Sequence, residues 1–293
     1  MKYISKLLNS FTEFIENQIN KFEFSTYSYA IARSLFAFGS LCTLLLNNPI
    51  HLFNPTNIEN PNHVLLPLNK ISIFYIFDQH LYFVNVISVI ILLITISGYR
   101  PKYTCIMHWW ISFSISASSF VIEGGDHVSQ IITLLLIPMC LTDNRKNHWN
   151  ISDKNFKPNI FASYSYFLIR LQVAFIYLEA SIGKLKIEEW KDGSVLYYWF
   201  TNSFVGSPLL ISPITNFIIK SPLLLTSATW SSLVLEFLLF MCITSFRKQR
   251  NIFLFFGLFF HFFIFIFFGL FSFMFAMSGA LLFYLSNFKK ESI

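Results

Sequence analysis

The stretch that decides the fold is RLQVAFIYLEASIGKLKIEEWKDGSVLYYWF, from Arg170 to Phe200. Its first half is apolar enough for a membrane-spanning helix, yet it contains Arg170 and Glu179. A charged side chain near the bilayer centre costs roughly 2.5–3.5 kcal/mol on insertion scales, so it needs a partner or a wet cavity. The stretch therefore predicts a helix that is surrounded by other helices and ends in a charged, aromatic segment.

Helical geometry divides the polar residues of this segment between two faces. At about 100° per residue, Gln172 and Glu179 lie nearly opposite the helix face that contains Arg170 and Lys184. The spacing from Glu179 to Lys184 is too wide for an ion pair within the helix, so we expect Lys184 to be presented at the outer helix end. The second set shares one face and consists of Arg170, Tyr177, Ser181 and Lys184.

The composition is that of a polytopic membrane protein, because 55% of the residues are hydrophobic and 12% are charged. The net charge of +6 falls on short loops between apolar runs, which favours orientation by the positive-inside rule and argues against a nucleic-acid partner. The four cysteines stand singly, and the Asp and His spacings form no metal signature. We therefore predict no metal site.

Apolar runs predict an all-α, polytopic membrane helical bundle of about eight spans with both termini cytoplasmic, and seven spans is the alternative. The run from residue 252 to 285 is too long for one helix, which favours two spans with a turn near Gly269 to Ser272. The run from 195 to 219 is broken by Gly206, Pro208 and Pro213 and predicts an interfacial segment. The other predicted spans cover about 28–46, 78–99, 106–122, 127–141, the helix of the opening stretch, and 223–244.

Three regions follow from this topology. Residues 1–27 form an amphipathic helix on the cytoplasmic membrane face, or a cytosolic helix docked on a partner protein. Residues 28–286 form the transmembrane domain, and residues 287–293 form a cytoplasmic tail. Arg33 lies near the cytoplasmic end of the first span, where snorkelling of its side chain to the interface is expected.

The fourth span is short, since about 15 residues give roughly 22 Å of helix against about 30 Å of hydrocarbon. Either the helix continues past Leu141, or its outer end lies in a recess that contains His127. Asp126 precedes this histidine and is suited to cap the helix.

The predicted topology brings four residues to the outer face, Glu123, Asp126, His127 and Lys184, with Glu179 about one turn below. A desolvated lysine releases its proton more readily and then serves as a base, while a histidine can pass protons or polarise a carbonyl. Lys184 and His127 are therefore the candidate catalytic residues. The alternative is that Lys184 is only a charge that marks a helix end.

Two further polar residues, Glu236 and His261, fall within later spans. They either satisfy each other or pair with Arg170 as structural contacts. An open polar path through Arg33, Arg170 and Glu236 would favour transport. A pocket that is closed toward the cytoplasm and open outward would favour chemistry.

These residues carry a resemblance to a known family. The runs RLQVAFIY from Arg170, EASIGKL from Glu179 and GDH from Gly125, with Gly193, resemble the SdpB family, the membrane component of the sporulation-delaying-protein toxin system. The resemblance extends from about residue 25 to 285. It implies a bacterial cell-membrane protein that acts, with a small partner protein, to turn a secreted precursor into an active antimicrobial peptide. The implied partners are this toxin precursor peptide, the small protein and membrane lipid.

That family is similar to the HTTM membrane domain shared with vitamin K-dependent gamma-glutamyl carboxylase. The resemblance implies that Lys184 is the base which activates a reduced quinone and that His127 assists it. A peptide-modifying membrane enzyme with a lysine base is one function that the resemblance implies, and a reduced quinone is the cofactor that it suggests. Gly183 replaces a second lysine, and no large extracytoplasmic domain follows the last span, so carboxylation of glutamate is not expected. Two alternatives to maturation of the toxin precursor are a non-catalytic exporter or scaffold for the toxin and a quinone-using, carboxylase-like enzyme.

Overall fold

The computed structural model describes residues 22–53, 70–120, 123–153, 155–156, 159–202, 206–286 and 288. Within these ranges the chain is helical, with isolated backbone bridges and no β-strand, which confirms the predicted all-α class. Residues 1–21 and all of 287–293 except Phe288 lie outside the described residues, so the predicted surface helix and tail stay predictions. The long helices within the described ranges are α2 (Tyr27–Leu46), α6 (Leu81–Ile96), α7 (Pro101–Ser118), α8 (Gly124–Leu141), α9 (Ile160–Lys184), α13 (Pro222–Met241), α14 (Arg247–Phe268) and α15 (Phe271–Leu285).

Six helices in the described part of the chain are long and apolar enough to cross a membrane, namely α2, α6 with its preceding turn, α8, α9, α13 with its following turn, and α14. Helix α15 has only 15 residues, and α7 includes four serines and a histidine among its 18 residues. The polytopic membrane bundle is thus confirmed. The choice between eight and seven spans stays a prediction.

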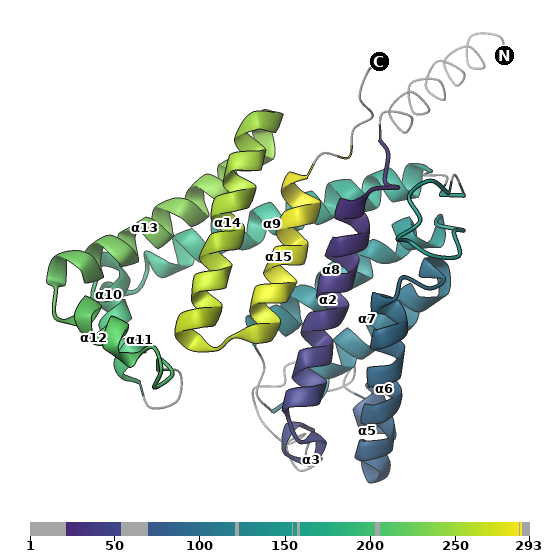
Figure 1. Cartoon of the computed structure of the whole chain (residues 1–293), viewed down its shortest axis with the longest axis horizontal. Helices are drawn as coiled ribbons and strands as arrows, with labels where there is room; N and C mark the ends of the chain where they lie inside the picture. Colours follow the sequence, from purple (N-terminus) through teal and green to yellow (C-terminus); the bar gives the residue numbers. More distant parts are fainter. Residues whose placement is uncertain are drawn as a thin grey trace.

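Helix α15 lies inside the bundle, and Figure 1 shows it between α14 and α2 with α8 and α9 behind. Its residues Ala276, Ala280 and Phe283 are fully buried. A helix of this length is about 22 Å long, which is shorter than the hydrocarbon core of about 30 Å. Because other helices surround it, α15 does not have to match the thickness of the lipid.

Helix α14 has the opposite character, since Gly257 and His261 are its only buried residues. Its many phenylalanines face outward, as lipid-facing side chains do. The helix ends at Phe268, and the next residue, Gly269, has a left-handed backbone with φ of 70° and donates its N–H to the carbonyl of Phe265 at 2.7 Å. This turn confirms that the run from 252 to 285 forms two helices.

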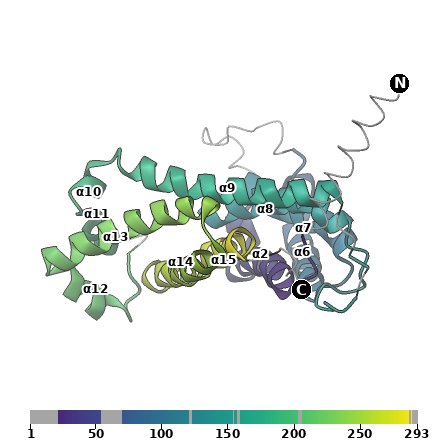
Figure 2. The same cartoon turned by 90° about the horizontal axis from the view of Figure 1, so that it is seen from above.

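The predicted break in the run from 195 to 219 is also found, as α11 (Val195–Thr201) and α12 (Ser212–Ile219). Figure 2 shows these helices, with α10 (Glu188–Lys191), gathered where α9 and α13 meet. Helix α8 begins at Gly124 rather than at His127 and ends at Leu141, so it is longer at the end predicted to face outward and does not continue past Leu141. The remaining short elements are α3 (Pro49–Leu52), α5 (Ile73–Ile76), η2 (Asp78–His80) and η3 (Cys242–Thr244).

One expectation about α9 is wrong, because this helix is not surrounded by others. Its buried face includes Ile169, Val173 and Tyr177, while Leu168 and Phe175 on the other face are 45% and 59% exposed. The helix packs on α8, α13 and α15, and all three lie on one side of it (Figure 2).

The segments predicted to be cytoplasmic lie at one end of the bundle. The backbone N–H of Arg100 donates to the carbonyl of Lys146 at 2.9 Å, and that of His148 donates to Gly98 at 3.0 Å, so the two basic loops pair. Glu23 likewise donates to the carbonyl of Phe288 at 2.7 Å, which places the two ends of the described chain side by side. The shared end agrees with the predicted topology, whereas the side of the membrane stays a prediction.

Arg33 corrects a second expectation, because its side chain is 1% exposed and does not snorkel. Its guanidinium donates to the Nδ1 atom of His148 at 3.1 Å and also to the hydroxyl of Thr104. Since an arginine can only donate, His148 must accept at Nδ1, and its Nε2 is then free to donate to Ser34 at 3.4 Å. A buried arginine is thereby satisfied by a neutral histidine from a loop far along the chain.

This contact predicts a pH dependence of stability. Burial, followed by the charges of Arg33 and Arg145, lowers the pKa of the His148 imidazole from 6.5 to about 2. The unfolded chain therefore binds a proton below about pH 6.5 that the folded chain does not. The contribution of His148 to stability should be constant above that pH and fall below it, with a slope approaching about 1.4 kcal/mol per pH unit.

Melting temperatures of the purified protein in detergent between pH 8 and pH 5 measure this effect. The substitution His148→Gln removes this one titrating group and should make the fall in stability below about pH 6.5 less steep. An equally steep slope in that variant would contradict the assignment to His148.

Candidate functional site

Lys184 ends α9 and forms an ion pair with Glu236 of α13. The side chains are 22% and 7% exposed, so the pair is largely shielded from solvent. The ammonium also lies 4.7 Å from the ring centroid of Trp190, because the chain turns after α9 and returns through α10. An ammonium between a carboxylate and an aromatic face is held in place from two sides.

A second polar pair lies further along the same face of α9. Tyr177 is seven residues before Lys184, and its hydroxyl is 2.8 Å from the Nε2 atom of His261 on α14. The exposed fractions of Tyr177 and His261 are 1% and 2%. We call these five residues the lysine cluster: Tyr177, Lys184, Trp190, Glu236 and His261.

Two buried atoms of the lysine cluster have no hydrogen-bond partner among the described residues. They are the Oε2 atom of Glu236 and the Nδ1 atom of His261. Buried polar atoms are nearly always paired, so such atoms mark places for a water molecule or for a polar group of a ligand. The cluster combines a lysine that can exchange a proton with a carboxylate and a histidine that can hold one.

The other predicted site residues form a separate group at the start of α8. Glu123 accepts a hydrogen bond from Ser272 at 2.5 Å, and Asp126 accepts one from the backbone N–H of Glu123 at 3.3 Å. The capping role considered for Asp126 is therefore found. His127 is exposed, and its Nδ1 atom is 2.9 Å from the hydroxyl of Ser116 on α7.

Phe273 of α15 lies between the two groups. Its ring centroid is 5.3 Å from that of His261, and a Cβ atom on Gly124 would be 3.3 Å from its ring. The structure thus gives Lys184 the partner Glu236 rather than His127. The catalytic roles of Lys184 and His127 stay predictions.

Arg170 and Glu179 have different surroundings from those expected. Arg170 donates to the backbone carbonyls of Tyr284 and Ile243, each at 3.2 Å, and no contact joins it to Glu236 in the described part of the chain. Glu179 is exposed on the far face of α9 from Lys184. Arg170 therefore has a structural role, and Glu179 lies outside the lysine cluster.

Sequence reasoning missed the pairing of Lys184 with Glu236 and the contact of Tyr177 with His261. The shared face of Tyr177 and Lys184 was the available signal, since it indicates that partners on neighbouring helices would meet both.

In the described residues no group of three or more His, Cys, Asp or Glu side chains could hold a metal ion.

The bundle and the lysine cluster define a polytopic α-helical membrane protein with a shielded polar site at one end of α9. No family model and no solved structure matches the chain. It is 32% identical to the sporulation-delaying protein SdpB of Bacillus subtilis over 284 residues, which cover 96% of this chain and 86% of SdpB. It is also 33% identical to the uncharacterized protein YitO of the same bacterium over 267 residues, 89% of this chain and 85% of YitO. The chain belongs to the SdpB family.

Proposed function

We propose that this chain is a cell-membrane component of a sporulation-delaying-protein type system and is required to mature a secreted antimicrobial peptide from its precursor. The similarity to SdpB along 96% of the chain supports the system. The observation that carries a chemical role is the ion pair of Lys184 and Glu236 beside two buried atoms without partners. The lysine cluster is the place where the precursor is handled.

In this proposal Lys184 is the base. Its ammonium transfers a proton to Glu236, and the free amine then accepts a proton from the substrate. Trp190 covers the amine and limits access of water to it, while Tyr177 fixes the orientation of His261 through its Nε2 atom. His127 lies in the neighbouring group and is suited to contact the precursor, because its ring is exposed.

A reduced quinone, implied by the HTTM resemblance, is compatible with the lysine cluster. The unpartnered atoms of Glu236 and His261 are suited to hydrogen-bond its hydroxyl groups, and Lys184 would be the acceptor of a hydroxyl proton. Such a group would supply the acidic hydroxyl when bound.

The rival function is a non-catalytic exporter or scaffold for the toxin. A continuous polar path through Arg33, Arg170 and Glu236 would support it. Each of these residues instead has its own partners: loop residues for Arg33, backbone carbonyls for Arg170 and Lys184 for Glu236. These separate contacts argue against such a path through the described residues.

Mass spectrometry of the secreted peptide tests the proposal. Cells that carry Lys184→Ala should leave the precursor unprocessed, with mature peptide reduced about 100-fold or more, because a positioned acid or base contributes 10²–10⁴-fold. His127→Ala should give a smaller reduction. Lys191→Ala is the matched control, since Lys191 pairs with Glu188 on the surface at 46% and 81% side-chain exposure and should not change the yield.

Protein amounts in the membrane are matched by blotting. Normal amounts of mature peptide from Lys184→Ala would reject the base and favour the scaffold. Mature peptide that is made but retained inside the cell would identify the exporter.

A further inference from the structure

The exposed face of α9 contains two polar residues in an otherwise apolar surface. Gln172 is the middle residue of this 25-residue helix and is half-buried, and Glu179 lies two turns further along and is exposed. Two turns of helix correspond to about 10 Å. The surrounding side chains of Leu168, Leu171 and Phe175 are 45%, 41% and 59% exposed.

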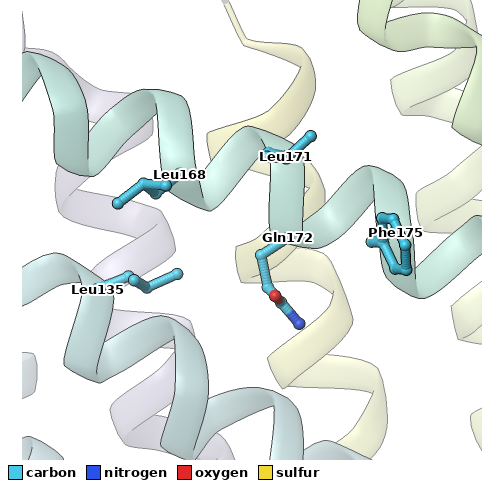
Figure 3. Close-up of a pocket in the computed structure, with 5 residues that line it drawn as sticks. All are labelled: Leu135, Leu168, Leu171, Gln172 and Phe175. Carbon is cyan, nitrogen blue, oxygen red and sulfur yellow. The ribbon is translucent and has the colours of Figure 1, made fainter.

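A groove between α8 and α9 opens on this face. It has a volume of about 210 Å³ and is lined by Leu135 of α8 and by four residues of α9, Leu168, Leu171, Gln172 and Phe175. Figure 3 shows Gln172 extending from α9 into this space, with Leu135 and Leu168 beside it. The groove exceeds the cavity of about 150 Å³ that accommodates a benzene ring, so it has room for a large apolar side chain.

Within the described residues, neither Gln172 nor Glu179 forms a hydrogen bond or an ion pair. A polar group that meets hydrocarbon without a partner costs several kcal/mol, and a charge at mid-membrane costs about 2.5–3.5 kcal/mol. The face therefore needs a hydrogen-bonding partner at the middle of α9 and a positive charge two turns nearer its Lys184 end.

We propose that this face docks a membrane-spanning helix of another polypeptide. That helix carries a hydrogen-bonding side chain opposite Gln172 and a lysine or arginine opposite Glu179, and it places an apolar side chain in the groove. The face is called the Gln172 face and consists of Leu135, Leu168, Leu171, Gln172, Phe175 and Glu179. It is separate from the lysine cluster, which lies on the buried side of α9.

Two other occupants fit less well. Lipid acyl chains fill a groove, but at the depth of Gln172 they offer no donor or acceptor. A second copy of this chain, related by a two-fold axis along the membrane normal, would place Glu179 against the partner's Glu179. Like charges at that position repel, so charge complementarity favours a helix that carries a cation.

The test measures energy transfer in nanodiscs between the labelled full-length protein and synthetic leucine-rich transmembrane peptides. One peptide carries asparagine and arginine seven residues apart, made in both sequence orders to allow either orientation, and the reference peptide has leucine at both positions. The Asn/Arg peptide should bind about tenfold more tightly than the reference, since interhelical polar contacts and one ion pair each contribute modestly.

Gln172→Leu and Glu179→Gln should each remove most of this preference. Glu189→Gln changes an exposed acid on α10 and is the matched control, which should leave it intact. The Glu179→Arg protein should no longer bind the Asn/Arg peptide and should instead bind a peptide with glutamate in place of arginine. This exchange requires a folded protein, so it separates lost docking from misfolding.

Equal binding of the leucine reference would overturn the proposal in favour of a lipid-facing groove. Energy transfer between two copies of the chain that disappears in Gln172→Leu would overturn it in favour of self-association. Neither outcome depends on secretion of the peptide, so a failure here is distinct from a failure of the proposed function.

Discussion

Replacing Asp143 by alanine should lower the free energy of unfolding by about 3–5 kcal/mol, because it leaves a buried arginine without its counter-ion. Asp143 and Arg145 have side-chain exposures of 0%. The guanidinium of Arg145 donates to both carboxylate oxygens, from Nε to Oδ1 and from Nη2 to Oδ2, at 2.8 Å each. Arg145 also donates to the carbonyl of His148, so the loss would loosen the loop that satisfies Arg33.

Thermal unfolding in detergent measures the effect, and a loss of this size corresponds to a fall of roughly 10 °C. Asp153→Ala in the same loop is the control, since Asp153 accepts one backbone hydrogen bond from Asn155 at 3.0 Å and is partly exposed. It should cost less than about 1 kcal/mol. Equal losses for the two variants would show that the buried ion pair is not what holds the loop.

The second large effect should come from Gly125→Ala. A Cβ atom at this position would lie 2.5 Å from the Cα atom and 2.7 Å from the nitrogen of Phe273, and backbone cannot move aside as a side chain can. Helices α8 and α15 would have to separate, which costs about 1–3 kcal/mol for overpacking. The separation would also weaken the hydrogen bond from Ser272 to Glu123.

Gly183→Ala is the matched control for this prediction. The nearest atom to its Cβ would be the Oε1 atom of Glu179 at 3.8 Å, an ordinary contact. Alanine in a helix is more favourable than glycine by about 1 kcal/mol, so this variant should be neutral or slightly stabilising. A Gly125→Ala protein with unchanged melting temperature and unchanged secretion would show that α8 and α15 tolerate separation.

The sequence indicated which residues belong to a candidate site, but it indicated only in part which residues they contact. Lys184, Glu236 and His261 can be picked out because a charged or titratable group in an apolar helix is energetically costly and therefore indicates a polar partner or a functional site. Their partners were not predictable from spacing, because Lys184 and Glu236 are 52 positions apart and Tyr177 and His261 are 84 apart. The expected contact of Lys184 with His127 assumed that outer helix ends converge, whereas Phe273 lies between these groups.

The sequence by itself determined that the chain is an all-α membrane protein, and it located most helix boundaries. Apolar length, Pro, Gly and charged loops act on a few neighbouring residues, so the turn at Gly269 and the break after α11 could be found locally. Only the tertiary structure decided that Arg33 is buried against His148, that α9 leaves the Gln172 face open, and that short α15 lies inside. Burial and ion pairing depend on which helices pack together. In a membrane, lipid and protein are similarly apolar surroundings, so the apolar length of a helix does not show which of the two will cover it.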